Sequence, residues 1–208
     1  MKKIGKLCVI TDTAVQKKYS HFELAKMAVK GGADIIQLRD KFLPTNELIE
    51  EAVKISAYCK KHNVLFLVND RVDIAMICDA DGVHLGKEDI PVREARKLLG
   101  RKKIIGGTAH SLKEAKQREK EGADYIGYGH IYATGSKFKP EKPKGTGELS
   151  IIVKKIKTPI LAIGGIGIEK IPELKQTGVH GVAVIGSVVK NKNPQKAVKE
   201  LRKAIYGK

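Results

Sequence analysis

The chain of 208 residues has little of what several classes of protein need. It has no tryptophan and only 5% aromatic residues, too few for a platform on which nucleic-acid bases stack. Its three cysteines, Cys8, Cys59 and Cys78, are far apart and form no Cys-x-x-Cys pair, which argues against a zinc site or a disulfide framework. No apolar run approaches the ~18 residues of a membrane span. No Gly-x-Gly-x-x-Gly follows the first predicted strand, which argues against a dinucleotide-binding fold.

Acidic residues are also scarce beside the basic ones, and the formal net charge is +17. The lysines are spread over nearly every predicted helix, so we expect the charge to attract anionic substrates and not to mark a nucleic-acid surface. The basic start, MKKIGKLCVITD, has too short an apolar run for a signal peptide and no small-residue cleavage site. We therefore expect a cytoplasmic protein that binds neither nucleic acid nor a membrane.

The sequence does contain a repeated junction between helix and strand. Gly or Ala-Asp-Gly precedes a short run rich in Ile and Val in KGGADIIQL, CDADGVHL, KEGADYIGY and QTGVHGVAV. Glycine commonly ends a helix, and a short β-branched run is typical of a buried strand. The predicted strands are 6–11, 34–38, 64–68, 81–85, 103–107, 124–128, 159–163 and 180–185. The predicted helices are 21–30, 45–62, 71–77, 91–99, 111–120, 148–157, 168–176 and 194–205.

Alternating strands and helices favour a parallel sheet of the α/β class. For eight strands in a chain of this length, a closed (β/α)8 TIM barrel is the simplest arrangement of the sheet, and an open doubly wound sheet is the alternative. No linker is evident, so we expect residues 1–208 to form a single barrel domain. Functional residues of such barrels gather at the C-terminal ends of the strands. The basic, proline-containing loop 137–145 is expected to be a mobile part of that face and not a domain boundary.

Polar side chains crowd the end of the second predicted strand. In QLRDK, Gln37, Arg39 and Lys41 occupy alternate positions, which share one face of an extended chain. An amide and two cations at a barrel mouth would form a cradle for a polyanion. The alternative is an ion pair or a solvated strand end, because Asp40 is adjacent.

Two acidic residues follow neighbouring predicted strands. Asn69 and Asp70 end the third strand, and Asp89 follows the fourth. Taken alone, either aspartate would be interpreted as a helix N-cap. On adjacent loops beside the cations of the second strand, however, the two carboxylates suit Mg²⁺, which takes oxygen ligands and shares them with substrate phosphates. The sequence thus predicts Mg²⁺ as a cofactor.

The remaining strand ends offer hydroxyls, histidines and glycines. Thr108 and His110 follow the fifth strand, and His130 follows the sixth. The turn Thr134-Gly135-Ser136-Lys137 suits an anion. AIGGIG after the seventh strand and AVIGSVV after the eighth are glycine turns of the kind that binds phosphate in many barrels, although ordinary turn chemistry is the alternative. We therefore expect a diphosphate on one side of the mouth and a monophosphate on the other.

Together these motifs resemble the thiamine phosphate synthase family along almost the whole chain, from LCVITD to VIGSVV. The resemblance rests on QLRDK, VNDRVDIA, DGVHLGKED, TAHS, GHIYATGSK and AIGGI. That family is a (β/α)8 barrel that joins hydroxymethylpyrimidine diphosphate to hydroxyethylthiazole phosphate and releases pyrophosphate in thiamine biosynthesis. The resemblance implies a Mg²⁺-dependent transferase with two small phosphorylated substrates and no protein nucleophile. It leaves the oligomeric state open, a homo-oligomer included.

The resemblance also implies roles for individual residues. Asp70 and Asp89 would bind Mg²⁺, while Arg39, Lys41 and Lys137 would act catalytically on the departing pyrophosphate. The residues implied to bind the pyrimidine diphosphate are Gln37, Leu38, Arg39, Asp40, Lys41 and Asn69, and Lys137 is implied to bind the pyrophosphate. Those implied to bind the thiazole phosphate are Thr134, Gly135, Ser136, Gly165, Ile185 and Gly186. Thr108 is a further implied substrate-binding residue. The chain departs from the family where Thr108 replaces Ser, Ala133 replaces Pro, Ser136 replaces Thr and Gly186 replaces Ser. The last change removes a hydroxyl from the phosphate nest, although Ser187 is adjacent.

Two other functions stay open. Thiazole tautomerases share the barrel and the phosphate nest and isomerise a carboxythiazole phosphate, and Gly-His-Ile after the sixth strand resembles their motif, with His130 as acid and base. The acidic pair Asp70 and Asp89, which the tautomerase type lacks, favours the synthase. The other alternative is a non-catalytic basic barrel that binds RNA.

Overall fold

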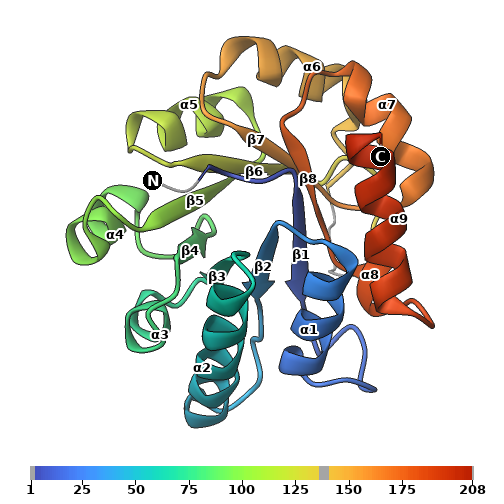
Figure 1. Cartoon of the computed structure of the whole chain (residues 1–208). Helices are drawn as coiled ribbons and strands as arrows, with labels where there is room; N and C mark the ends of the chain where they lie inside the picture. Colours follow the sequence, from blue (N-terminus) through green and yellow to red (C-terminus); the bar gives the residue numbers. More distant parts are fainter. Residues whose placement is uncertain (1–2, 136–140, 208) are drawn as a thin grey trace.

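The computed structural model describes residues 3–135 and 141–207. They form a closed barrel in which parallel strands follow the order β1-β2-β3-β4-β5-β6-β7-β8, with the helices outside it (Figure 1). Each strand pairs with the next one in sequence, and β8 pairs back to β1. The predicted (β/α)8 TIM barrel is therefore confirmed, and the open doubly wound sheet is excluded.

The boundaries agree with the predicted elements to within a few residues. The strands are β1 Leu7–Thr11, β2 Ile35–Leu38, β3 Leu65–Asn69, β4 Gly82–Leu85, β5 Ile104–Ala109, β6 Tyr125–Gly129, β7 Ile160–Ile163 and β8 Gly181–Val184. The helices are α1 His21–Gly31, α2 Thr45–Lys61, α3 Val72–Ile77, α4 Val92–Leu99, α5 Leu112–Lys120, α6 Gly145–Lys155, the 3₁₀ turn η1 Ile168–Lys170, α7 Ile171–Gln176, α8 Gly186–Val189 and α9 Pro194–Tyr206.

Two features differ from the prediction. Helix α6 begins at Gly145, so the end of the expected loop 137–145 is helical; residues 137–140 lie outside the described residues. The short helix α8 was not expected, because the valines of GSVV favour strands over helices. It forms directly after β8 and lies at the C-terminal mouth of the barrel.

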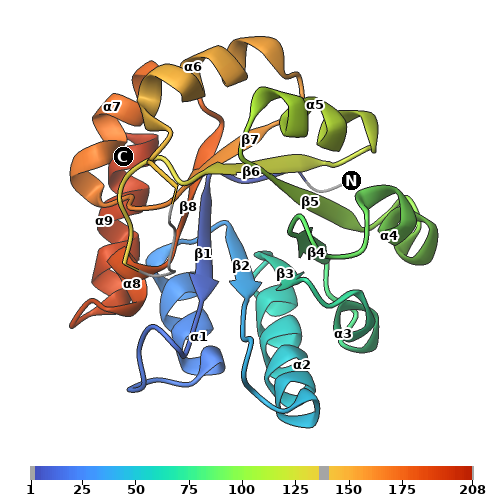
Figure 2. The same cartoon turned by 180° about the vertical axis from the view of Figure 1, so that it is seen from behind.

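Side chains of the strands alternate between two apolar cores. Cys8 and Ile10 of β1 and Ile35 of β2 belong to the cluster inside the barrel. Val9 and Ile36 belong to the larger cluster between the barrel and the helices. This alternation follows from the two-residue period of a strand. Helix α1 packs outside β1 and β2, and α2 packs outside β3 (Figures 1 and 2). No helix within residues 3–135 and 141–207 is long and apolar enough to cross a membrane.

Asp34 joins three elements on the side of the barrel opposite the mouth. Its carboxylate accepts the N–H groups of Lys6 at 3.0 Å and Leu7 at 2.9 Å, just at the start of β1. It also accepts the Tyr206 hydroxyl at 2.7 Å and the Arg202 guanidinium at 3.0 Å, both from α9. One side chain therefore holds β1, the start of β2 and the last helix together.

We expect Asp34→Ala to lower the free energy of unfolding by about 2 kcal/mol, because it leaves several donors without a partner. Glu94→Ala is the control, since the ion pairs of Glu94 among the described residues are surface pairs with Arg93 and Lys97, which contribute little. Urea denaturation followed by circular dichroism measures both. Equal stability of the two variants would contradict the role of Asp34.

Candidate active site at the C-terminal mouth of the barrel

A polar network inside the barrel forms the floor of the mouth. Tyr125 fills the interior, and a Cβ atom at Gly106 would lie 2.2 Å from its ring, so only glycine fits there. The Tyr125 hydroxyl lies 2.8 Å from His84 Nδ1, and His84 Nε2 lies 2.9 Å from the Thr108 hydroxyl. Gln37 hydrogen bonds the same tyrosine, whose pKa burial raises well above its ordinary value. This network orients Gln37 and Thr108, two of the predicted substrate-binding residues.

Arg39 is held by a buried acid that the sequence analysis did not single out. Its guanidinium forms an ion pair with Asp12, which directly follows β1 and also accepts the Ala14 N–H at 3.1 Å. Because Thr11 pairs with Leu38 in the register of β1 and β2, Asp12 and Arg39 follow side by side. Arg39 does form an ion pair, as the alternative for QLRDK allowed, but with Asp12 and not with the adjacent Asp40. However, Arg39 Nε is buried and has no hydrogen-bond partner among the described residues.

The side chains of Asp40 and Leu38 make their contacts within the protein and not at the open mouth. The Asp40 carboxylate accepts the Thr13 hydroxyl at 2.5 Å, the N–H groups of Phe42 and Leu43 at 2.7 Å each, and lies 3.0 Å from His21 Nε2. Burial opposes ionisation of Asp40, but these hydrogen bonds outweigh it and hold its pKa well below the ordinary value. The Leu38 side chain packs in the outer core. Asp40 therefore organises the loop after β2, and Leu38 can offer a ligand only its backbone.

Asp70 and Asp89 come together at the mouth, as the sequence predicted. Asp70 follows β3 with its backbone in the left-handed region, at a φ of 66°, and its carboxylate pairs with the Lys41 ammonium. Asp89 follows β4 and accepts the Gly86 N–H at 2.6 Å. Burial, and next a hydrogen bond with Asp70, raise the pKa of Asp89. Two carboxyl groups thus meet where a hard cation would relieve their repulsion.

Among the described residues, the two carboxyl groups are the candidate ligands for such a cation. Within the described part of the chain, no group of three His, Cys, Asp or Glu side chains could hold a metal ion. Asn69, also predicted to bind substrate, ends β3 beside this pair and is paired in register with His84 of β4. Two carboxylates suit Mg²⁺, which keeps few protein ligands and takes other oxygens from water and phosphate.

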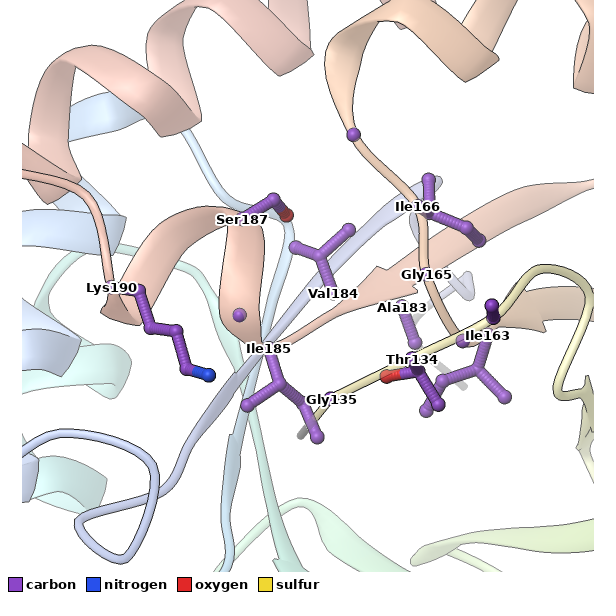
Figure 3. A pocket seen from close by; sticks show the side chains of 14 residues that line it. Thr134, Gly135, Ile163, Gly165, Ile166, Ala183, Val184, Ile185, Ser187 and Lys190 are labelled. Atoms are coloured by element: carbon purple, nitrogen blue, oxygen red, sulfur yellow. The ribbon is translucent and has the colours of Figure 1, made fainter. Parts of the chain in front are cut away.

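A pocket of about 280 Å³ lies on the other side of the mouth (Figure 3). It brings together Thr134 and Gly135 after β6, Gly165 after β7, and Ile185 and Gly186 after β8, as predicted. Ser136 and Lys137, predicted beside them, lie outside the described residues. The structure therefore gathers the described members of the expected monophosphate site around one cavity.

Glycine is required in one wall of this pocket. Gly165 has a φ of 67°, and a Cβ atom there would lie 2.3 Å from the Ala133 carbonyl oxygen. Gly164 has a φ of 101° and would place a Cβ atom 2.3 Å from His130 Cβ. The glycine pair thus allows the turn after β7 to pack directly against the segment after β6. His130 itself is buried at this junction.

Ser187 and Lys190 also line the pocket, and the sequence analysis missed their contribution. Both belong to the short helix α8 and its end, which was not predicted. Ser187 Oγ and Arg39 Nε are the two buried side-chain polar atoms without a hydrogen-bond partner in the described residues. One lies at each of the two expected anion sites.

The fold and the mouth define a class of protein. A closed (β/α)8 barrel with paired cations and carboxylates on one side of its mouth and a glycine-walled pocket after β7 and β8 is built to bind phosphorylated small molecules. Comparison with known proteins narrows this class. The sequence model of the family described as thiamine monophosphate synthase matches residues 7–188. The chain belongs to this family.

Individual relatives agree with this assignment. The chain is 45% identical over 201 residues to a thiamine-phosphate synthase of Chlorobium phaeobacteroides, covering 97% of this chain and 96% of the relative. It is 42% identical to one of Salinibacter ruber, covering 99% of this chain and 91% of the relative. A solved structure, thiamine phosphate pyrophosphorylase from Pyrococcus furiosus, is 40% identical and superposes with a TM-score of 0.88 over 97% of this chain and 96% of its own.

We expect Gly165→Ala to destabilise the protein by about 1–3 kcal/mol, because the methyl group meets backbone and the left-handed φ disfavours alanine. Gly147→Ala in α6 is the control: a Cβ atom there meets nothing within 4 Å, and alanine favours helices. Thermal unfolding compares the two variants. A melting temperature of Gly165→Ala equal to that of Gly147→Ala would contradict the close packing of this turn.

Proposed function

We propose that this chain joins hydroxymethylpyrimidine diphosphate to hydroxyethylthiazole phosphate and releases pyrophosphate, the thiamine phosphate synthase reaction. Membership of the family and relatives with this name at 42–45% identity over nearly the full chain support the proposal. In the structure, the carrying observation is the Asp70–Asp89 pair beside Lys41, since a carboxylate pair facing a cation suits a metal-bound diphosphate. The proposal includes a cytoplasmic location for the enzyme.

The side of the mouth after β2, β3 and β4 would take the diphosphate. In this proposal Asp70 and Asp89 hold Mg²⁺, which when bound supplies positive charge to the leaving pyrophosphate. Arg39 and Lys41 add their own charges to those of the metal. Lys137 is proposed to act with them and lies outside the described residues.

These groups would stabilise the charge that develops as the leaving group departs. The bond between the pyrimidine methylene carbon and the pyrophosphate oxygen breaks, and its electron pair stays on that oxygen. The amino group of the pyrimidine ring delocalises the positive charge left on carbon. The ring nitrogen of the thiazole then forms the new bond to that carbon. The chain supplies charge and position, and no side chain forms a covalent intermediate.

The pocket after β6, β7 and β8 would hold the thiazole phosphate. Thr134, Gly135, Gly165, Ile185 and Gly186 are proposed to surround the phosphate group. Both substrates are then bound at one mouth, with their phosphate groups on opposite sides. Holding the two reacting atoms between these sites converts an encounter in solution into a reaction within one complex.

We expect Asp70→Asn and Asp89→Asn each to lower the rate of thiamine phosphate formation by about 100-fold or more, because each removes a carboxylate from the proposed Mg²⁺ site. Fold stability should change little, because both residues lie on loops at the mouth. Asp73→Asn is the control, since Asp73 is exposed and, among the described residues, forms its ion pair with Arg71. The assay couples both substrates with and without EDTA. A wild-type rate that survives excess EDTA would refute the Mg²⁺ assignment.

His130→Asn separates the synthase from the thiazole tautomerase. His130 is buried at the mouth beside Gly164. A tautomerase needs a side chain that moves a proton at carbon, and its removal typically costs 10²–10⁴-fold. The ionising synthase needs none. We therefore expect His130→Asn to keep Mg²⁺-dependent coupling within about tenfold of wild type, or about 1.4 kcal/mol, while Asp70→Asn abolishes it.

The same two variants are assayed for isomerisation of carboxythiazole phosphate. Loss of an isomerase activity in His130→Asn, with no effect of Asp70→Asn or EDTA on that activity, would replace the synthase by the tautomerase.

A further inference from the structure

We propose that His21 is a positioning residue for the reaction at the mouth, and that it acts through Asp40 on the loop after β2 that carries Arg39 and Lys41. The catalytic use of these two cations rests on the proposed function. The attachment of the loop to His21 does not, because it follows from contacts among the described residues.

His21 is a buried histidine with a partner for each ring nitrogen. It is the first residue of α1, and only 1% of it is exposed. Its Nδ1 lies 2.8 Å from the Thr11 hydroxyl at the end of β1, and its Nε2 lies 3.0 Å from the Asp40 carboxylate. Burial of a polar ring is tolerated where its hydrogen bonds are made. One side chain thus connects the first helix to β1 and to the loop after β2.

The direction of the hydrogen bond to Asp40 follows from the charge of that carboxyl group. Burial opposes ionisation of Asp40, but its hydrogen bonds hold its pKa well below the ordinary value. An ionised carboxylate only accepts, so His21 Nε2 carries the hydrogen and donates it to Asp40. In the neutral ring, Nδ1 then accepts the hydrogen of the Thr11 hydroxyl.

A hydroxyl, a histidine and a carboxylate in this order are also the parts of a nucleophilic triad. Thr11 is 0% exposed, however, so its hydroxyl cannot reach a substrate. The chain of contacts therefore serves the geometry of the mouth and not a covalent step. This agrees with a reaction in which no side chain forms a covalent intermediate.

Asp40 lies between the two cations in the sequence, so contacts that fix Asp40 restrict both neighbours. Its Oδ1 accepts the N–H groups of Phe42 and Leu43, which close the turn of the loop itself. Its Oδ2 accepts the hydrogen of His21 Nε2 and the Thr13 hydroxyl. Among the described residues, these last two contacts link the Asp40 side chain to other parts of the fold.

The two cations depend on this link to different degrees. Arg39 has further supports, since its N–H donates to the Thr11 carbonyl at 3.1 Å and its guanidinium pairs with Asp12. The Lys41 side chain is 49% exposed and pairs with Asp70. Without the histidine, we expect the loop to shift as a unit, and Lys41 to be displaced more than Arg39. A displacement of about 1 Å at a catalytic group can cost on the order of 100-fold in rate.

The test uses two substitutions that each replace one ring nitrogen by an amide. In His21→Gln the side-chain amide nitrogen can take the place of Nε2 and donate to Asp40. In His21→Asn the shorter amide takes the place of Nδ1, so it reaches Thr11 and loses Asp40. The control is His180→Asn, which removes the contact of His180 Nε2 with the Ile4 carbonyl at 2.8 Å, just before β8 and on the side of the barrel opposite the mouth.

Three measurements report on different steps. Steady-state kinetics gives KM for each substrate of the coupling reaction. Isothermal titration calorimetry gives the Kd for pyrophosphate with Mg²⁺, which needs no turnover. Hydrogen exchange of the Phe42 and Leu43 amides reports how firmly the loop is fixed.

We expect His21→Asn to raise KM for the pyrimidine diphosphate and the Kd for pyrophosphate by about tenfold, because the cations no longer have a fixed position. KM for the thiazole phosphate should stay within about twofold of wild type, because that substrate is proposed to bind on the other side of the mouth. The Phe42 and Leu43 amides should exchange faster. His21→Gln should keep values near those of wild type, and His180→Asn should lower the melting temperature without a change in KM.

A double variant separates positioning from general stability. In a Lys41→Ala background, His21→Asn should lose most of its effect on KM for the pyrimidine diphosphate, because both changes act on one group. A purely structural role of His21 would leave that effect undiminished.

Four results would overturn the inference. The first is a wild-type KM for the pyrimidine diphosphate in His21→Asn. The second is an equal loss in His21→Asn and His21→Gln, which would exclude the hydrogen bond to Asp40 as the cause. The third is an equal rise of KM in His180→Asn, and the fourth is an undiminished effect in the Lys41→Ala background. Failure of the proposed function looks different: wild type would then not couple the substrates with Mg²⁺, while pyrophosphate binding and amide exchange would still depend on His21.

Discussion

Closure of the parallel strands into one barrel is the constraint on which the rest of the molecule depends. All strands run in the same direction, so their C-terminal ends meet at one mouth whatever their separation in the sequence. The pairing of β1 with β2 places Asp12 next to Arg39, and the pairing of β3 with β4 brings the loops of Asp70 and Asp89 together. The closing pair of β8 with β1 completes the ring. In an open sheet with another strand order, these strands would not be neighbours, and most of the side-chain contacts at the mouth would not form.

In the proposed function, the two sides of the mouth would bind anions by different physical means. The side after β2 to β4 uses side-chain charges, and each cation is held by an acid: Arg39 by Asp12 and Lys41 by Asp70. Such pairs fix the long cationic side chains in place, and removal of one partner from a buried pair leaves an uncompensated charge. A diphosphate would then meet cations whose positions are already set. Because these side chains are already ordered in the free protein, less conformational entropy is lost when the ligand binds.

The side after β6 to β8 depends on backbone geometry. Gly164 and Gly165 let two segments approach more closely than any other residue allows, and this close packing shapes the pocket wall. The polar groups of that wall are few, and they come mainly from the short helix α8.

The sequence by itself determined the order of strands and helices, because glycine stops and short β-branched runs are local signals. It also determined which residues follow the strands, and hence the residues of the mouth, including Asp70, Asp89 and Gly165. It did not reveal that Asp12 forms an ion pair with Arg39, or that Ser187 and Lys190 line one pocket. Nor did it reveal that the Asp40 carboxylate accepts hydrogen bonds from the loop that follows it. Those facts depend on strand register and on a four-residue helix with no sequence signal of its own. Only the tertiary structure decided them, because a side chain's partners are set by the strands that pack beside it and not by its neighbours in sequence.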